Sequence, residues 1–335
     1  MLDAIMMKKK VLIIRFNSIG DIVLTSPVVQ ALSNEGYEVH YLCKKTYSSL
    51  LSAIPNITKA HLFDGNLAQT TKALSEEKFH YIIDLHNNYR SNKVARALRV
   101  KAHRLQKQRI KLFLLTKLNF KVQPQKHIVD RFMQVVSPLL STKMLSTQVR
   151  HQVTFDIGHE QIRKINSLKL PSTFVAISIG AAYYTKRIPT DKIIEIINGL
   201  SMPVVLLGGK DDRDRSNDIV TKSVNDMINL VGAVSIIESA EVINRSKVLI
   251  TGDTGLMHIG AAIGVPIVAV FGSTHPVLGY TPYYHDQAAF SIIENIDLKC
   301  RPCTKQGRAS CPKGHFNCMN NITTQSIIKE IKRFI

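Results

Sequence analysis

The sequence predicts an α/β fold built from two Rossmann-like domains, and three observations support this prediction. Short apolar runs rich in β-branched residues alternate with helix-length segments along the whole chain. The runs are continuously apolar, which is typical of parallel strands covered on both faces by crossover helices. The pattern occurs in both halves of a 335-residue chain, which is long enough to bury two cores.

The first half supplies the elements of the first predicted domain, residues 1–155. Val11–Phe16 (VLIIRF) is expected to form a buried strand that leads through the turn NSIGD into a helix from about Ile22. Further strands are expected at Tyr37–Cys43 and Tyr81–Leu85, with a helix-length segment between them at Leu67–Glu77. The lone Cys43 is expected to be a buried small apolar residue.

The second half repeats this plan in a predicted domain 156–320. Its four strand candidates are FVAISI, VVLL, KVLI and IVAVF, at Phe174–Ile179, Val204–Leu207, Lys247–Ile250 and Ile267–Phe271. The boundary is placed in the polar stretch 141–159, which has no clear period. A last segment, 321–335, has apolar residues at helical spacing, at Ile327, Ile328 and Ile331.

The overall composition is that of a folded protein without a membrane span. Hydrophobic residues make up 45% of the chain and charged residues 21%, which is ordinary for a globular protein. No apolar run approaches the roughly 18 residues of a spanning helix. Lys8–Lys10 precede only Val11–Ile14 before Arg15 interrupts the apolar run, so a signal peptide is not predicted. A cytoplasmic location is therefore expected.

The positive charge is concentrated in the first half. The formal net charge is +19, with 24 Lys and Arg against 9 Asp and Glu in residues 1–150 and 20 against 16 in residues 151–335. The stretch 86–131 holds 13 basic residues and one acid, Asp130. Such a field attracts nucleic acid, an anionic membrane or a phosphorylated substrate. The alternative is a solvated basic face that serves only solubility.

In an open parallel sheet, ligands bind beyond the carboxyl ends of the strands, so the loops after the strands are the places to search. The first such loop is RFNSIGD, residues 15–21. Asp21 could take a proton from a bound hydroxyl, or it could cap a helix, for which Asp is among the best residues. The loop has one glycine and so lacks the G-x-G-x-x-G fingerprint of a dinucleotide site.

Two loops of the second half could hold a phosphorylated ligand. In GAAYYTKRIP, residues 180–189, small residues such as Gly180 allow close approach and Lys186 could neutralise a phosphate. After VVLL, the loop GGKDD places Asp211 and Asp212 where an acid could hold a ribose hydroxyl. Each is also explained by an ordinary turn with solvated charges.

The fourth loop, TGDTGLMH at 251–258, carries the strongest signal. Thr254 and Gly255 precede a small-residue helix, whose free N–H groups attract phosphate. His258, one turn into the helix, would face the same ligand, and Asp253 would cap the helix or orient a nucleotide. A capped helix alone does not explain a Gly-rich run followed by a histidine.

These loops resemble those of the lipopolysaccharide heptosyltransferases, which are inverting enzymes of glycosyltransferase family 9. The matching segments appear in family order over nearly the whole chain, and the first and last are long and specific. They are VLIIRFNSIGDIVLTSPVVQAL (11–32), DLHNNYRS (84–91), HIVDRF (127–132), VAISIGAAYYTKRIP (175–189), VLLGG (205–209) and TGDTGLMHIGAAIGVPIVAVFGST (251–274).

The resemblance implies two facing Rossmann-like domains of the GT-B type, with the active site in the cleft between them and a C-terminal helix packed back on the first domain. It implies that the second domain binds a nucleotide-sugar, most typically ADP-heptose, and that the first binds an anionic lipid-linked acceptor at the inner face of the membrane. No cofactor is implied. Asp21 matches the catalytic base. The donor-binding positions would be Gly180, Thr185, Lys186, Asp211, Asp253, Thr254, Gly255 and His258, and the acceptor-binding positions Arg15, Ser18 and Arg90.

This chain departs from the family pattern at two points. Ile188 stands where an aromatic residue often precedes the proline of the second loop, and the chain has no Trp to stack on a sugar. Both departures bear on which donor sugar is used, and less on the type of reaction.

Four cysteines lie close together near the C-terminus. Cys300, Cys303, Cys311 and Cys318, with His315 between the last two, offer soft ligands for a structural zinc ion. The spacing matches no standard zinc finger, and reduced buried thiols are the alternative. Disulfides are not expected in a reducing cytoplasm.

Two other functions stay open from the sequence. A nucleotide-sugar epimerase would keep the donor loop but would need no basic acceptor surface. A nucleic-acid-binding protein would need aromatic stacking platforms, and Tyr89, Phe113 and Phe120 form no such pattern within 86–131. No nucleic-acid partner is therefore expected, and the missing glycine fingerprint disfavours a nicotinamide dehydrogenase.

Overall fold

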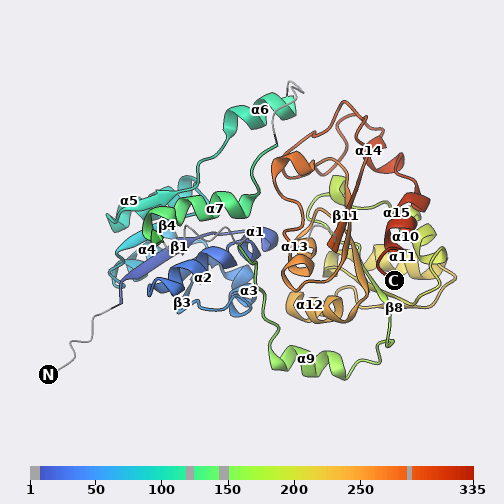
Figure 1. The fold of residues 1–335 in the computed structure, drawn as a ribbon, viewed down its shortest axis with the longest axis horizontal. Coiled ribbons are helices and arrows are strands. Elements are labelled where there is room, and N and C mark those ends of the chain that lie inside the picture. The colour runs from blue at the N-terminus through green and yellow to red at the C-terminus, as the bar shows by residue number, and fades with distance from the viewer. Residues whose placement is uncertain (1–7, 118–123, 143–150, 285–288) are drawn as a thin grey trace. The chain divides into compact units, whose positions relative to one another are not determined.

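The structure, a computed structural model, describes residues 8–117, 124–142, 151–284 and 289–335. The chain divides into two compact α/β units (Figure 1). Unit 1 consists of Met1–Lys107 and Ile128–Asp156, and unit 2 of Gln108–His127 and Ile157–Ile335. The division after residue 156 falls next to the expected boundary, part of which (143–150) lies outside the described residues.

The segment 108–127 belongs to the second unit, although a single first domain 1–155 was expected. The reason is a pair of contacts near its end: Gln125 N donates to Val277 O at 3.0 Å, and the His127 side-chain nitrogen Nε2 lies 3.0 Å from Thr281 O. These bonds connect the segment to residues that follow the second sheet's β10 (Ile267–Phe271).

Unit 1 is built on a five-stranded parallel sheet with the order β3-β2-β1-β4-β5. The central strand β1 (Lys10–Ile14) is buried along most of its length, as the run VLII predicts. The other strands are β2 (Glu38–Lys44), β3 (Lys59–Phe63), β4 (Tyr81–Asp84) and β5 (Ala102–Arg104).

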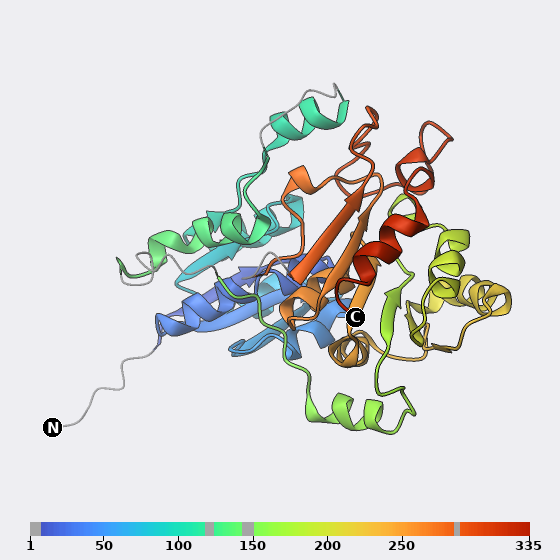
Figure 2. The same ribbon diagram turned by 45° about the vertical axis from the view of Figure 1, so that its right-hand side comes forward.

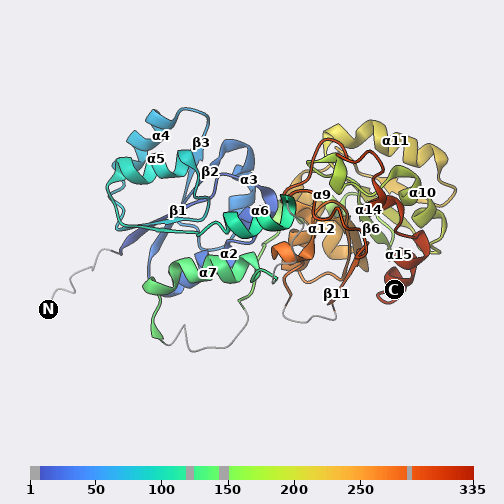
Figure 3. The ribbon, with the colours of Figure 1, turned by 90° about the horizontal axis from the view of Figure 1, so that it is seen from above.

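Helices cover both faces of this sheet (Figure 3). On one face α2 (Ser26–Asn34) packs against α7 (Ile128–Val136), and on the other α4 (Leu67–Ser75) packs against α5 (Tyr89–Leu98). Two shorter helices follow β1 and β2, namely α1 (Ile19–Val23) and α3 (Ser48–Ser52), the latter preceded by the 3-10 turn η1 (Lys45–Tyr47). A second such turn, η2 (Ser137–Leu139), follows α7.

Unit 2 contains a six-stranded parallel sheet with the order β11-β10-β9-β6-β7-β8. Its four inner strands coincide closely with the predicted apolar runs, because they are buried on both faces. The strands other than β10 are β6 (Val175–Ser178), β7 (Val204–Leu207), β8 (Met227–Asn229), β9 (Val248–Gly252) and β11 (Phe290–Glu294).

The helices of unit 2 also form two layers. On one face α10 (Thr190–Asn198) contacts α11 (Arg213–Lys222), and on the other α12 (Ile236–Arg245) contacts both α9 (His159–Asn166) and α13 (Gly255–Ala262). The remaining helical segments are α6 (Arg109–Lys117), α14 (Asn317–Asn320) and the 3-10 turns η3 (Tyr184–Lys186), η4 (Lys210–Asp212) and η5 (Pro276–Leu278). None of the described helices is long and apolar enough to cross a membrane.

The C-terminal helix α15 (Thr324–Ile331) packs inside the second unit, which corrects the expectation that it packs on the first domain. It lies against α10, β10 and β11, and Figure 2 shows it in red beside the orange strands. Ile327 and Ile331 are fully buried in the unit 2 core, and Thr324 Oγ1 bonds to Glu195 on α10. The apolar stripe of α15 is thus buried against the sheet of unit 2.

Chain order reverses between two central strands in each sheet, between β1 and β4 in unit 1 and between β6 and β9 in unit 2. Ligands of open parallel sheets bind at the carboxyl ends of the strands at such a reversal. The register aligns the end of β1, Ile14, with Asp84 at the end of β4, and the end of β6, Ser178, with Thr251 on β9. Two places, one in each unit, are therefore the first candidates for a site.

Candidate functional site

The reversal point of unit 1 brings together three of the predicted residues. Arg15 follows β1, Ser18 is the N-cap of α1, and Asp21 is the third residue of that helix. Arg15 Nη2 lies 2.5 Å from Asp21 Oδ1, while Ser18 donates to Asp21 Oδ2 from its hydroxyl at 2.9 Å and from its backbone N–H at 3.3 Å. Ser18, not Asp21, is thus the N-cap of α1, but Asp21 keeps a capping role at the third helical position of a capping box, in which its carboxylate accepts from the N–H of Ser18.

The electrostatics around Asp21 keep its carboxyl ionised. Burial raises the pKa of Asp21, but the charge and hydrogen bond of Arg15 and the bonds from Ser18 outweigh burial and lower it below the ordinary value. A lowered pKa means that the carboxylate is present throughout the neutral range, ready to accept a proton. The side chains of Asp21 and Arg15 are 16% and 11% exposed, and the Asp21 Oδ1 atom that faces Arg15 is itself buried.

The loop after β4 adds residues that the sequence did not single out. Arg15 Nη1 donates to Leu85 O at 2.6 Å, which fastens the first loop to this one. Buried Asp84 accepts from the backbone N–H groups of His86 and Asn87 at 3.0 and 2.6 Å. Burial, followed by the charge of Arg15, lowers the pKa of His86 to about 3, so its ring is neutral. The polar residues His86, Asn87 and Asn88, which follow the run YIIDL, were the available signal in the sequence.

Arg90, the third predicted acceptor-binding residue, lies farther along, in the first turn of α5. Its guanidinium is 5.8 Å from the Phe63 ring centroid, and the Phe63 ring is 5.2 Å from that of Phe16. The Arg90 side chain is exposed. Among the described residues, no contact joins Arg90 to Asp21. Arg90 instead contacts Phe63, which contacts Phe16, the residue that follows Arg15.

The reversal point of unit 2 joins two of the predicted donor-binding residues directly. Lys186, in the loop after β6, lies with its Nζ 2.9 Å from Asp253 Oδ2, in the loop after β9. Both side chains are largely buried, with 16% and 11% of their surfaces exposed. Gly252 is required at the end of β9, because a Cβ there would clash with the carbonyl oxygen of Lys186. The sequence suggested both residues but not their pairing.

Thr185, also predicted to bind the donor, is instead occupied within the protein. Its side chain is buried, and its hydroxyl accepts from Ser273 Oγ at 2.8 Å and from Arg308 N at 2.8 Å. Thr185 N in turn donates to Arg308 O at 3.1 Å. Thr185 thus fixes the lysine loop between the end of β10 and the Cys-rich segment.

Gly180 lies beside the acidic loop after β7. A Cβ at Gly180 would clash with the Asp212 carboxylate, which accepts from Gly209 N at 3.0 Å and lies 3.4 Å from Arg187 Nη2. Asp212 is buried in this role, whereas Asp211 is exposed. Of the two acids, only Asp211 offers a carboxylate to the solvent for a ribose hydroxyl. Arg187 was not predicted to take part.

The helix α13 starts as the fourth motif predicts. Thr254 is its N-cap, with its hydroxyl 3.0 Å from that of Thr251, and Gly255 is its first residue. His258 is buried in the first turn. Asp253 precedes the cap and holds Lys186, so the start of the helix, with its free N–H groups, stands next to a lysine that can bind phosphate.

The cysteines near the C-terminus are free thiols. Burial raises the pKa of Cys303 to about 11 and that of Cys318 to about 12, and the neighbouring thiols add to both shifts. Cys300 Sγ is 3.9 Å from His315 Nε2. Among the described residues, this segment does not gather three donor atoms within 4.8 Å, in contrast to His40, His61 and Glu77 of unit 1, which are described below.

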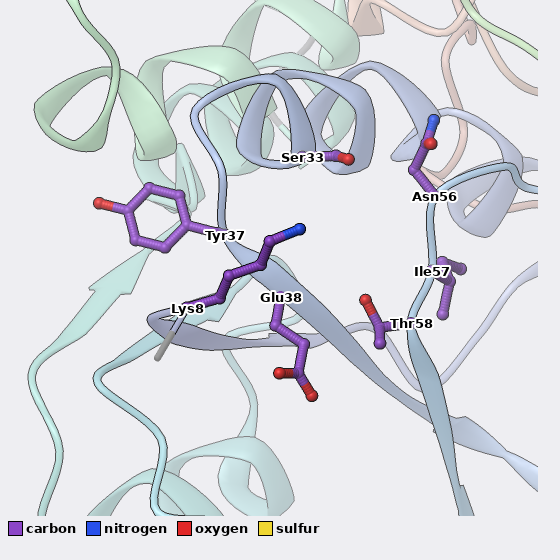
Figure 4. A pocket seen from close by; sticks show the side chains of 7 residues that line it. All are labelled: Lys8, Ser33, Tyr37, Glu38, Asn56, Ile57 and Thr58. Atoms are coloured by element: carbon purple, nitrogen blue, oxygen red, sulfur yellow. The ribbon is translucent and has the colours of Figure 1, made fainter. Parts of the chain in front are cut away.

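A pocket of about 320 Å³ opens in unit 1 at the starting ends of the strands (Figure 4). Its polar lining includes Lys8, Ser33, Glu38 and Thr58. Ligands of open parallel sheets bind at the opposite, carboxyl ends of the strands, so this pocket is not assigned to the cluster around Asp21.

Known proteins resemble the chain over nearly its whole length. The model of "Glycosyltransferase family 9 (heptosyltransferase)" matches residues 67–312. Lipooligosaccharide heptosyltransferase 2 of Campylobacter jejuni is 24% identical over 326 residues, 95% of each chain.

Two solved structures share the fold. A family 9 glycosyltransferase from Veillonella parvula has a TM-score of 0.77 and 21% identity, with 97% of each chain covered. Escherichia coli ADP-heptose LPS heptosyltransferase II has a TM-score of 0.75 and 20% sequence identity, and the match covers 97% of this chain and 98% of that one.

Proposed function

The chain belongs to glycosyltransferase family 9, and from that premise we propose that it transfers heptose from ADP-heptose to a lipopolysaccharide-core acceptor, with inversion at the anomeric carbon. Membership in the family makes it a glycosyltransferase; the sugar, the nucleotide and the acceptor are the proposal. The observation that supports it most is the Lys186–Asp253 pair beside the start of α13, at the strand reversal of unit 2.

The donor half of the proposal rests on charge. The pyrophosphate of a nucleotide-sugar would bind Lys186 and the free N–H groups at the start of α13. The leaving nucleoside diphosphate gains negative charge as its bond to the anomeric carbon breaks, and the same groups would stabilise that charge. Asp211, exposed in the turn that follows β7, would accept from a ribose hydroxyl.

The acceptor half rests on Asp21. A hydroxyl oxygen of the acceptor sugar attacks the anomeric carbon, and its proton passes to the Asp21 carboxylate as the new bond forms. Because the pKa of Asp21 is low, the proton moves late, when the attacking oxygen has become acidic. Arg15 and Ser18 would orient the carboxylate, and Arg15 and Arg90 would attract anionic groups of the acceptor.

The basic stretch 86–131 supports a lipid-linked acceptor and a position against the inner face of the membrane, although residues 118–123 lie outside the described part of the chain. Clustered Lys and Arg attract anionic lipid, and salt weakens that attraction. We expect the protein to bind anionic vesicles at low salt and to be released at high salt. The measurement is vesicle sedimentation at both salt concentrations; binding that is absent, or indifferent to salt, would contradict the idea.

The donor is tested with a panel of ADP-, GDP-, UDP- and CMP-sugars in thermal unfolding. A ligand that binds the native state raises the melting temperature by mass action. ADP-heptose is expected to give the largest shift. A larger shift with another nucleotide would overturn the ADP assignment, and conversion of the donor without any acceptor would favour an epimerase.

A further inference from the structure

Three metal-ligating side chains meet in unit 1, away from Asp21 and toward the starting ends of the strands. His40 lies on β2, His61 on β3, and Glu77 just beyond α4. One donor atom of each lies within 4.8 Å of the other two. His40 Nδ1 is 2.9 Å from His61 Nε2 and 3.9 Å from Glu77 Oε2.

A fourth residue orients the most buried of the three. His40 Nε2 lies 2.9 Å from Glu38 Oε1, and since a carboxylate only accepts, the nitrogen carries the proton. Its Nδ1 is then left with a lone pair directed at His61 and Glu77. A carboxylate behind a histidine in this way is the usual outer-shell partner of a metal ligand.

We propose that His40, His61 and Glu77 form a binding site for one divalent transition-metal ion, separate from sugar transfer. Metal–nitrogen and metal–oxygen bonds of about 2.0–2.1 Å keep two ligands of one ion within about 4.2 Å of each other, and the 2.9 and 3.9 Å separations fit this limit. The ion replaces the proton between the two rings, and that proton, the single N–H of His61, moves to the other ring nitrogen, Nδ1, so that His61 stays neutral. Two imidazoles and a carboxylate suit an ion such as Zn²⁺.

Two lysines compete for the same carboxylate. Lys59 Nζ lies 2.5 Å from Glu77 Oε1, and Lys10 Nζ lies 3.1 Å from Glu77 Oε2. Lys10 bonds Oε2, the oxygen that lies 3.9 Å from His40 Nδ1, and Lys59 bonds Oε1. Lys59 is 57% exposed and can turn to solvent, which frees Oε1 and lets the carboxylate rotate toward the ion. The ion would connect β2, β3 and the chain after α4, and would stabilise unit 1 against unfolding by mass action.

The test titrates Zn²⁺ into the full-length, chelator-treated protein by calorimetry. The parent protein for this test carries Cys300→Ser and Cys303→Ser, which removes two of the thiols of the Cys-rich segment that could compete for the metal. One ion per chain is expected to bind. His61→Ala and Glu77→Gln should each weaken binding about tenfold to a hundredfold or more, since loss of even an outer-shell partner has that effect.

Two further variants make the test independent of misfolding. Lys59→Met removes the competing ammonium group and should tighten Zn²⁺ binding. His80→Ala, whose ring only accepts from Lys10 N at 3.1 Å, is the matched histidine control and should leave binding unchanged. The proposal is overturned if the parent with Cys300→Ser and Cys303→Ser binds no Zn²⁺, if His61→Ala binds as tightly as that parent, or if Lys59→Met weakens binding. None of these results bears on sugar transfer.

Discussion

Asp21→Asn is expected to slow sugar transfer by a factor of about 10²–10⁴, the usual cost of losing a general base. Asn keeps an oxygen that can accept from Ser18, so α1 should still form. It cannot take the proton of the attacking hydroxyl. The rate is measured in single turnover with saturating donor and acceptor, alongside a melting curve and the donor affinity.

The structure adds a cost in stability to this variant. Asp21 also pairs with Arg15 in a largely buried contact, whose loss should lower the free energy of unfolding by about 1.5–3 kcal/mol. Arg15→Gln breaks the same pair but keeps the carboxylate, and so serves as the matched control for stability. A protein with Asn at position 21 that transfers at nearly the parent rate would leave Asp21 with a structural role only.

Lys186→Ala is expected to weaken donor binding by about 1.5–3 kcal/mol, the contribution of a hydrogen bond to a charged group. That corresponds to roughly a 10- to 150-fold rise in the dissociation constant. The loss should lie at the upper end, because the variant leaves Asp253 without its partner and beside the pyrophosphate. Calorimetric titration of the donor measures it.

Lys222→Ala is the matched control for this measurement. Lys222 pairs with Asp218 on the exposed surface of α11, so its removal should leave donor affinity unchanged. Equal affinities for the parent and for Lys186→Ala would remove Lys186 from the donor site and the main support for the donor half of the proposal.

The inner strands could be predicted from the sequence because burial on both faces gives them unbroken apolar runs. VVLL and IVAVF coincide with β7 and β10. The edge strands gave little signal, because they are partly exposed and short. β3, with the sequence KAHLF, is mostly exposed, and β5 and β8 have three residues each.

The sequence motifs could nominate individual candidate residues, but they could not predict which of these residues contact one another. The motifs pointed to Asp21, Lys186 and Asp253. The Lys186–Asp253 contact depends on β6 and β9 being neighbours, and the Arg15–Asp21 contact depends on the path of the loop between β1 and α1. The role of Thr185 could not be foreseen, because its partners lie 88 and 123 residues away in sequence. The C-terminal helix was placed wrongly, because an apolar stripe does not say which sheet it covers.

Heptosyl transfer itself is measured by incubating the protein with ADP-heptose and a lipopolysaccharide-core acceptor and analysing the acceptor by mass spectrometry and NMR. We expect the acceptor to gain one heptosyl unit with inverted anomeric configuration, ADP to be released in equal amount, and donor alone to be left unchanged. An unmodified acceptor under conditions where the donor binds, or a product with retained configuration, would contradict the proposed transfer.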